Sequence, residues 1–170
     1  LKVLHSELDG KQEIGFVGIS NWTLDASKMN RGIHLSVQEP NLDDLILTSD
    51  TISTDIYEDI KNINTYKAMI ENLTKSYYEY KEYIKKYYKS NYDFHGARDF
   101  YYLVKIAAHL LKINDKARTL ENIAMESIER NFGGLELDKE EDNKIWMSTN
   151  KFKQIFSKIQ NNYIEDKEKY

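Results

Sequence analysis

Residues 65–89, TYKAMIENLTKSYYEYKEYIKKYYK, decide the fold of this chain. Apolar and aromatic side chains recur here at alternating intervals of four and three residues: Tyr66, Ile70, Leu73, Tyr77, Tyr80, Ile84 and Tyr87. A stripe with this period is typical of a long α-helix that buries one face. From residue 75 onward the stretch carries five Lys and two Glu, a local net charge of +3. It predicts a long amphipathic helix in a mainly helical fold.

Other helices are expected on both sides of this one. Their predicted starts are Asn41 after Pro40, Thr54 or Asp55, Gly96, Thr119, and Ser148 or Thr149. Asn41 and Thr119 are good N-caps because their side chains can accept a hydrogen bond from the first turn. The helix from Gly96 to about residue 113 is strongly apolar, and the helix from Thr119 is expected to stop at the glycine pair 133–134. Seven Gly and one Pro in 170 residues are few, which fits long helices.

Two short strands are expected before the helices. Residues 14–19, IGFVGI, form a short apolar run, and residues 33–37, IHLSV, alternate apolar and polar side chains. Two strands do not make a stable sheet by themselves, so they either pair with strands outside this chain or form a small appendage. The predicted fold class is mainly α, a helical bundle with a short two-strand remnant of an α/β core.

The predicted organisation has three parts. Residues 1–40 form the C-terminal edge of an α/β core, residues 41–164 form a helical domain, and residues 165–170 form a charged tail. Within the helical domain, residues 136–142 carry a net charge of −4 and are expected to be an exposed linker.

Composition excludes several classes of protein. The absence of cysteine excludes disulfide scaffolds and thiolate metal sites, and it favours a reducing compartment such as the cytoplasm. The net charge of −4 argues against a general nucleic-acid binder. No apolar run approaches the roughly 20 residues of a membrane span, and the charged first residues do not resemble a secretory signal. Since the chain starts without Met, it is expected to be a piece of something larger or a processed product.

The sequence contains no complete catalytic centre. There is no Gly-x-x-x-x-Gly-Lys-Ser/Thr phosphate loop and no pair of acidic residues after a predicted strand. The histidines, His5, His34, His95 and His109, lack the spacing of a metal site, so no bound metal is expected.

Three polar residues beside predicted element boundaries remain as candidates. Asn21 follows the first strand, where α/β sheets bind ligands; its alternative is an Asx-turn. Arg31 precedes the second strand and could offer a planar fork to a phosphate; its alternative is a solvated charge. Arg98 lies in the first turn of a helix, where a cation is unfavourable; its alternative is an ion pair with Asp93 or Asp99. With only 4 Arg against 20 Lys, the position of each Arg is informative.

Three motifs resemble a known family. Residues 16–33, FVGISNWTLDASKMNRGI, resemble the end of the core of AAA+ ATPases, in particular of the mysterin-like family, giant AAA+ proteins that are also RING-type E3 ubiquitin ligases. Residues 93–103, DFHGARDFYYL, and residues 130–133, RNFG, resemble later motifs of the same family. The resemblance spans roughly residues 1–134.

The resemblance implies a role for each candidate. Asn21 is implied to be sensor 1, which positions the attacking water, and Arg31 the arginine finger, which reaches the nucleotide of a neighbouring AAA+ module. Gly96 and Arg98 are implied to bind the nucleotide of their own module, with Arg98 as sensor 2 and the helical domain as the AAA+ lid. The implied cofactors are ATP and Mg²⁺ in the full-length parent, with none held tightly by this chain.

The same resemblance implies the partners, which are the upstream half of the AAA+ core and a neighbouring AAA+ module. Because Walker A and Walker B motifs are absent, the chain is expected to be inactive alone. Two alternatives stay open. Residues 77–92 hold seven of the thirteen tyrosines among lysines, so the helical domain could be a non-catalytic module that binds a protein or a nucleic acid. The stripe over residues 66–87 could instead form a coiled-coil dimer.

Overall fold

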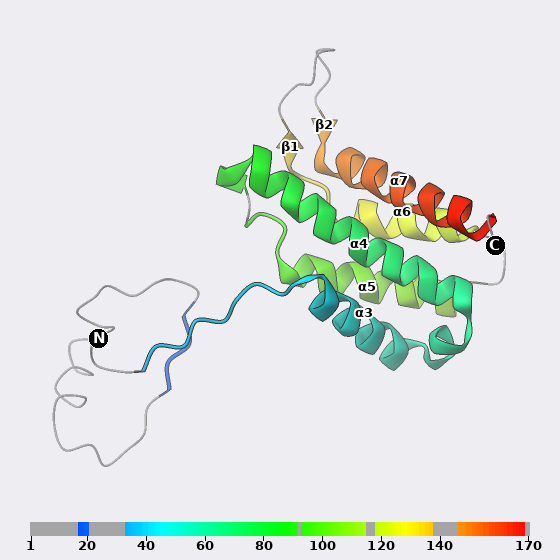
Figure 1. Cartoon of the computed structure of the whole chain (residues 1–170), viewed down its shortest axis with the longest axis horizontal. Helices are drawn as coiled ribbons and strands as arrows, with labels where there is room; N and C mark the ends of the chain where they lie inside the picture. Colours follow the sequence, from blue (N-terminus) through cyan, green and yellow to red (C-terminus); the bar gives the residue numbers. More distant parts are fainter. Residues whose placement is uncertain (1–16, 21–32, 92, 115–117, 138–145, 169–170) are drawn as a thin grey trace, which may run out of the picture. The chain divides into compact units, whose positions relative to one another are not determined.

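The computed structural model describes residues 17–20, 33–91, 93–114, 118–137 and 146–168. The chain divides into two units, Leu1–Glu39 and Pro40–Tyr170. Figure 1 shows the second unit as a group of packed helices, which confirms the prediction of a mainly α fold.

The described residues of the first unit form no regular secondary structure. Their apolar side chains are almost fully exposed: Val17 89%, Ile19 96%, Ile33 93%, Leu35 84% and Val37 93%. The strand predicted over residues 33–37 is therefore wrong, as is the described part of the strand predicted over residues 14–19. Alternation of apolar and polar residues does not make a strand by itself, because a strand also needs a hydrogen-bonded neighbour and an apolar surface to cover.

The second unit contains all the helices and strands of the described residues. The α-helices are α3 (Leu42–Ile56), α4 (Asn64–Tyr87), α5 (Ala97–Lys112), α6 (Leu120–Asn131) and α7 (Ser148–Glu168). Two 3₁₀ helices, η1 (Glu58–Asn62) and η2 (Lys89–Asn91), follow α3 and α4. Strand β1 (Glu136–Leu137) pairs antiparallel with β2 (Trp146–Met147), directly before α7.

The predicted N-caps are confirmed at α3 and α6. The Asn41 side chain accepts a hydrogen bond from the Asp44 N–H at 2.9 Å, and the Asp44 carboxylate accepts from the Asn41 N–H at 3.1 Å. The Thr119 hydroxyl accepts from the Asn122 N–H at 3.1 Å. Each contact satisfies a backbone donor that has no partner inside its helix.

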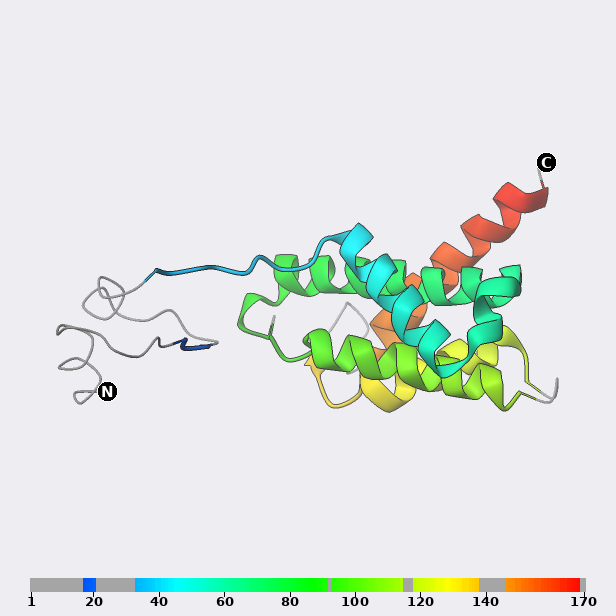
Figure 2. The same cartoon turned by 90° about the horizontal axis from the view of Figure 1, so that it is seen from below.

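Helix α4 joins the other helices of the second unit. It packs against α3, α5 and α7, while α5 also packs against α3 and α6; Figures 1 and 2 show this arrangement from two directions. The predicted stripe of α4 forms the centre of the core, with Ile70, Leu73, Tyr77, Tyr80 and Ile84 each no more than 4% exposed. Tyr87 was expected in the same stripe but is 59% exposed, because the helix ends at that residue.

Three boundaries differ from the prediction. Helix α3 continues to Ile56, so no new helix starts at Thr54 or Asp55. The hydroxyls of Ser49, Thr51 and Ser53 donate to carbonyls earlier in α3, which lets these three residues lie in its interior. Residues 136–137 of the predicted linker form β1, and Leu137 is buried at 3% exposed, whereas residues 138–142 of that linker lie outside the described residues. Helix α7 continues through Glu168, beyond the expected end at residue 164.

Candidate functional site

Two of the four predicted site residues are among the described residues. Asn21 and Arg31 lie outside the described residues, as do most of the residues between the two expected strands. Gly96 and Arg98 are described: Gly96 is the N-cap of α5, and Arg98 lies in the first turn of that helix with an exposed side chain. Of the predicted site, the described residues therefore contain one end, the start of α5.

The first turn of α5 is closed by an acidic side chain. The Gly96 N–H donates to the Asp99 carboxylate at 2.8 Å, and the Gly96 carbonyl accepts from the N–H groups of Asp99 and Phe100 at 3.2 and 3.3 Å. Gly96 has extended backbone with φ −98°, and a Cβ added to it would meet no atom within 4 Å. Neither the backbone nor the packing of the described residues thus requires a glycine at this position.

Arg98 differs from the other described arginines. Arg118 and Arg130 both donate to Glu126, at 3.0 and 2.7 Å. Arg98 forms no ion pair with any described residue, so the expected alternative of a pair with Asp93 or Asp99 is not found. The Asp99 carboxylate instead accepts a hydrogen bond from the N–H of Gly96, the N-cap of α5. Of the described arginines, Arg98 is thus both the one predicted to bind nucleotide and the one that forms no ion pair with a described acid.

A buried histidine precedes this turn. His95 is only 4% exposed; its Nδ1 lies 2.8 Å from the Tyr80 hydroxyl on α4, and its Nε2 lies 3.4 Å from the carbonyl oxygen of Gly133, after α6. Burial lowers the pKa of His95, although the contact with the Gly133 carbonyl opposes this shift. Burial raises the pKa of the fully buried Tyr80 hydroxyl. Both groups are therefore neutral near pH 7.

Aromatic rings surround this pair. The Phe132 ring lies 4.9 Å from the His95 ring, 5.7 Å from Tyr80 and 4.6 Å from Phe152, measured between centroids. The Ser148 hydroxyl, at the start of α7, donates to the Phe132 carbonyl at 2.6 Å. The fold thus brings together two motifs quoted from the sequence, residues 93–103 and 130–133.

No pattern in the sequence indicates that Tyr80 and Ser148 lie close to His95 and the start of α5. Tyr80 was identified only as a member of an apolar stripe, and His95 only as a histidine without metal spacing. The available signal was the position of His95 directly before Gly96, inside the same motif as Arg98. Its partners are 15 and 38 residues away along the chain, so their proximity follows from the fold.

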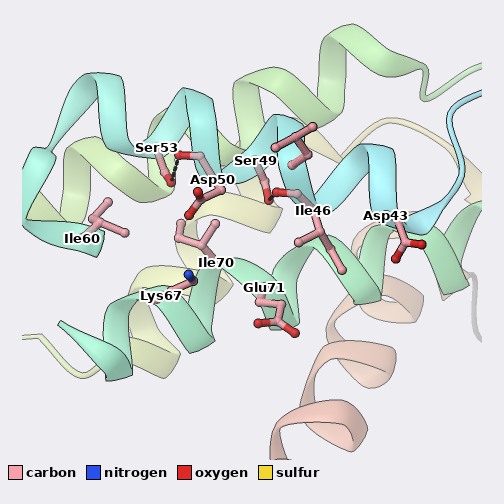
Figure 3. A pocket seen from close by; sticks show the side chains of 10 residues that line it. Asp43, Ile46, Ser49, Asp50, Ser53, Ile60, Lys67, Ile70 and Glu71 are labelled. Atoms are coloured by element: carbon pink, nitrogen blue, oxygen red, sulfur yellow. Dashed lines mark hydrogen bonds between the residues drawn. The ribbon is translucent and has the colours of Figure 1, made fainter. Parts of the chain in front are cut away.

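A separate groove lies between α3 and α4 (Figure 3). It has a volume of about 310 Å³, an apolar floor that includes Ile46, Ile60 and Ile70, and charged side chains such as Asp43 and Lys67 at its edge. Ser49 and Ser53 line the groove, and the hydroxyl of each donates to a backbone carbonyl of α3. Gly96 and Arg98 do not line it, so the groove is distinct from the start of α5.

The aromatic residues of α4 are divided between core and surface. Tyr77 and Tyr80 are buried, whereas Tyr87 is exposed, and the Lys151 ammonium of α7 lies 4.2 Å from the centre of the Tyr83 ring. Much of the tyrosine-rich stretch therefore supports packing between helices. Among the described residues, no three metal-ligating side chains come together. No described helix has the length and apolarity needed to cross a membrane.

Comparison with known proteins gives a consistent result. The family described as the RNF213 AAA domain matches residues 1–44. The E3 ubiquitin-protein ligase RNF213 of Homo sapiens is 32% identical over 145 residues, which cover 79% of this chain and 3% of that protein. The E3 ubiquitin-protein ligase rnf213-beta of Danio rerio is 34% identical over 149 residues, which cover 88% of this chain and 3% of that protein. No solved structure matches the chain.

These matches extend well beyond the first unit. They reach over most of the helical unit, whereas the match to the AAA domain family ends at residue 44. The chain spans about 3% of the length of the two relatives, so it corresponds to a short part of proteins that are far larger. The chain is therefore related over most of its length to one segment of the RNF213 (mysterin) proteins, and its resemblance to the mysterin-like family is confirmed.

Proposed function

We propose that this chain is the C-terminal part of an AAA+ ATPase module, and that its second unit is the helical lid of that module. Arg98 acts as sensor 2 and, together with Gly96, binds the nucleotide of the same module. Asn21 acts as sensor 1, and Arg31 acts as the arginine finger toward a neighbouring module. The partners of the chain are the upstream half of its core and that neighbouring module.

The environment of Arg98 carries this proposal. Its guanidinium is exposed and forms no ion pair with a described residue, and it stands two residues after a glycine that no described contact requires. A cation in the first turn is unfavourable for a helix, but an anion bound at the same place compensates for it. A nucleotide phosphate fits these features, because it accepts a bidentate contact from Arg and can approach the backbone closely at Gly.

The roles of Asn21 and Arg31 rest on sequence similarity. Both positions lie inside residues 1–44, which match the RNF213 AAA domain family. An amide can orient the water that attacks the terminal phosphate, and an arginine can stabilise the charge of the transition state by about 10³–10⁵ in rate. Lys offers no comparable planar fork, which gives weight to an Arg in a chain so rich in Lys.

ATP with Mg²⁺ would supply the phosphoryl group and the cation that neutralises its developing charge. The described residues fit part of this ligand: the exposed Arg98 suits a phosphate, and the free space where Gly96 lacks a Cβ leaves room for one. They contain no cluster of metal-ligating side chains, so they do not supply the magnesium site. We expect no ATP turnover from the 170-residue chain by itself, because its sequence lacks Walker A and Walker B motifs.

The test uses an AAA+ protein that carries this segment together with its nucleotide-binding half. Arg98→Ala should weaken nucleotide binding or turnover by roughly 10- to 150-fold, the effect of losing a hydrogen-bonded contact to a charged group. Arg118→Ala is the matched control, because it also removes an exposed arginine at the start of a helix, but one paired with Glu126. Equal effects of the two substitutions on binding and turnover would refute the role of Arg98.

The relatives are named E3 ubiquitin-protein ligases. We propose that the whole protein that contains this chain is also an E3 ubiquitin-protein ligase. We propose further that this protein is located in the cytoplasm. Arg98→Ala in that whole protein allows the two activities to be measured in parallel. ATP turnover should fall as above, since the lid acts on the nucleotide.

A further inference from the structure

The side chain that precedes the N-cap of α5 is buried between three segments of the second unit. We infer that His95 is a positioning residue for Arg98: its ring fixes the first turn of α5 and thereby the direction in which the guanidinium is presented. The part of this inference that concerns the nucleotide rests on the proposed function above. The mechanical part, that His95 fixes this turn, depends only on the contacts of the His95 ring.

Both nitrogens of the His95 ring are in use. The Gly133 carbonyl oxygen near Nε2 can only accept a hydrogen bond, so Nε2 carries the proton of the neutral ring. Nδ1 is then the acceptor, and the Tyr80 hydroxyl donates to it at 2.8 Å. One side chain therefore links the start of α5 to α4 and to the end of α6.

The ring has little freedom to turn. Phe94 packs edge to face against it at 4.8 Å, and Phe132 lies 4.9 Å away on a different segment. A buried polar group with all its partners present adds rigidity, whereas loss of one partner leaves the other unsatisfied. The Tyr80–His95–Gly133 bridge is therefore suited to hold one orientation.

The position of the bridge explains why it acts on Arg98. Gly96 has no side chain, so within the cap the first turn is closed only by Asp99, a residue of the same helix. That contact shapes the turn from within the helix, while the buried Phe100 ring of the same turn stacks on Tyr77 of α4 at 4.7 Å. His95 provides a second attachment, one residue before the cap and three residues before Arg98. A displacement of about 1 Å at a phosphate-binding group can cost about 100-fold in rate.

The first experiment examines the full 170-residue chain by NMR and hydrogen exchange. The ¹⁵N shifts of His95 should show the neutral Nε2–H tautomer, and an Nδ1–H tautomer would overturn the bridge. In His95→Leu, the amides of Asp99 and Phe100, which donate to Gly96, should exchange roughly 5- to 150-fold faster relative to the end of α5. His95→Gln keeps a donor near the Nε2 position and should restore most of the protection.

A matched control separates this effect from general loss of stability. Asn72, on α4, is a buried polar residue like His95. It donates to Gln160 on α7 at 2.8 Å, away from the start of α5. Asn72→Leu should leave the relative exchange of the first turn of α5 unchanged. If Asn72→Leu accelerates those amides as much as His95→Leu does, the positioning role is overturned.

The second experiment places the same substitutions in an AAA+ protein that contains this segment and its nucleotide-binding half. His95→Leu should reduce ATP turnover, His95→Gln should recover it in part, and the double variant with Arg98→Ala should be no slower than Arg98→Ala alone. Effects of His95→Leu and Arg98→Ala that multiply would overturn the inference, since His95 would then act independently. An Arg98→Ala variant with unchanged nucleotide binding and turnover would refute the proposed function instead, and the exchange data would still decide the mechanical role of His95.

Discussion

Phe132 offers the sharpest test of how the second unit is held together. Its side chain is fully buried after the end of α6, and its ring contacts aromatic rings from three other segments. The centroids lie 6.0 Å away for Tyr77, 5.7 Å for Tyr80, 4.9 Å for His95 and 4.6 Å for Phe152. Phe132→Ala removes all of these contacts and leaves a cavity beside the His95 bridge.

The expected loss is large for a single residue. Truncation of a fully buried Phe to Ala costs about 3–5 kcal/mol, which combines lost transfer free energy with the cavity left behind. Domains of this size unfold with about 5–15 kcal/mol, so roughly a fifth or more of the free energy of unfolding is at stake. At roughly 3 °C per kcal/mol for a chain of this length, the melting temperature should fall by about 10–15 °C.

Urea unfolding of the full chain, followed by far-ultraviolet circular dichroism, measures this loss. Phe94→Ala is the matched control, because the Phe94 ring is 53% exposed and makes an edge contact with His95. Its substitution should cost about 1 kcal/mol or less. A loss below about 1.5 kcal/mol for Phe132→Ala, or equal losses for both variants, would refute the view that this aromatic cluster is the centre of the core.

Three further measurements test the rest of the unit. Asn41→Ala should lower the free energy of unfolding by about 1 kcal/mol through loss of the α3 cap, and an unchanged urea midpoint would contradict it. Burial lowers the pKa of His95, so as the pH falls below about 6.5 the unfolded chain takes up a proton before the folded chain does. The free energy of unfolding should therefore decrease below that pH, and it should decrease less in His95→Gln. Equal pH dependence in both chains would contradict that assignment. Glu126→Ala removes the shared partner of Arg118 and Arg130 but should cost under about 1 kcal/mol, because both arginines are about half exposed. That small cost should shrink further at high salt, and a cost above about 2 kcal/mol would show that the pair is structurally important.

Helical periodicity predicted the core well. The strongly apolar helix predicted from Gly96 to about residue 113 is confirmed as α5, and its apolar face is buried, because side chains spaced by about 3.6 residues lie on one face of a helix. Caps were equally predictable, since Asn41 and Thr119 act on backbone groups only three residues away. Prediction failed where a residue pattern depends on a distant partner. The alternating residues 33–37 form no strand in the described structure, and Leu137 of the expected linker is buried.

In the candidate site too, local features were predictable and contacts with other parts of the fold were not. Arg98 was found from a local conflict, a cation in the first turn of a helix, together with a motif resemblance. The absence of a described acidic partner for it could not be foreseen, because Asp93 and Asp99 are close enough in sequence to pair with it. Asp99 instead caps α5, a contact that only the built helix reveals.

By itself, the sequence determined the helices, their buried faces and caps, and the family to which the chain is related, because these depend on local spacing or on motifs. The tertiary structure alone decided which motifs meet. It joins residues 93–103 to residues 130–133 through the Tyr80–His95–Gly133 bridge. The physical reason is that a hydrogen bond in the core depends on where whole helices pack, and helix packing is set by the sum of many side chains and not by the two that finally touch.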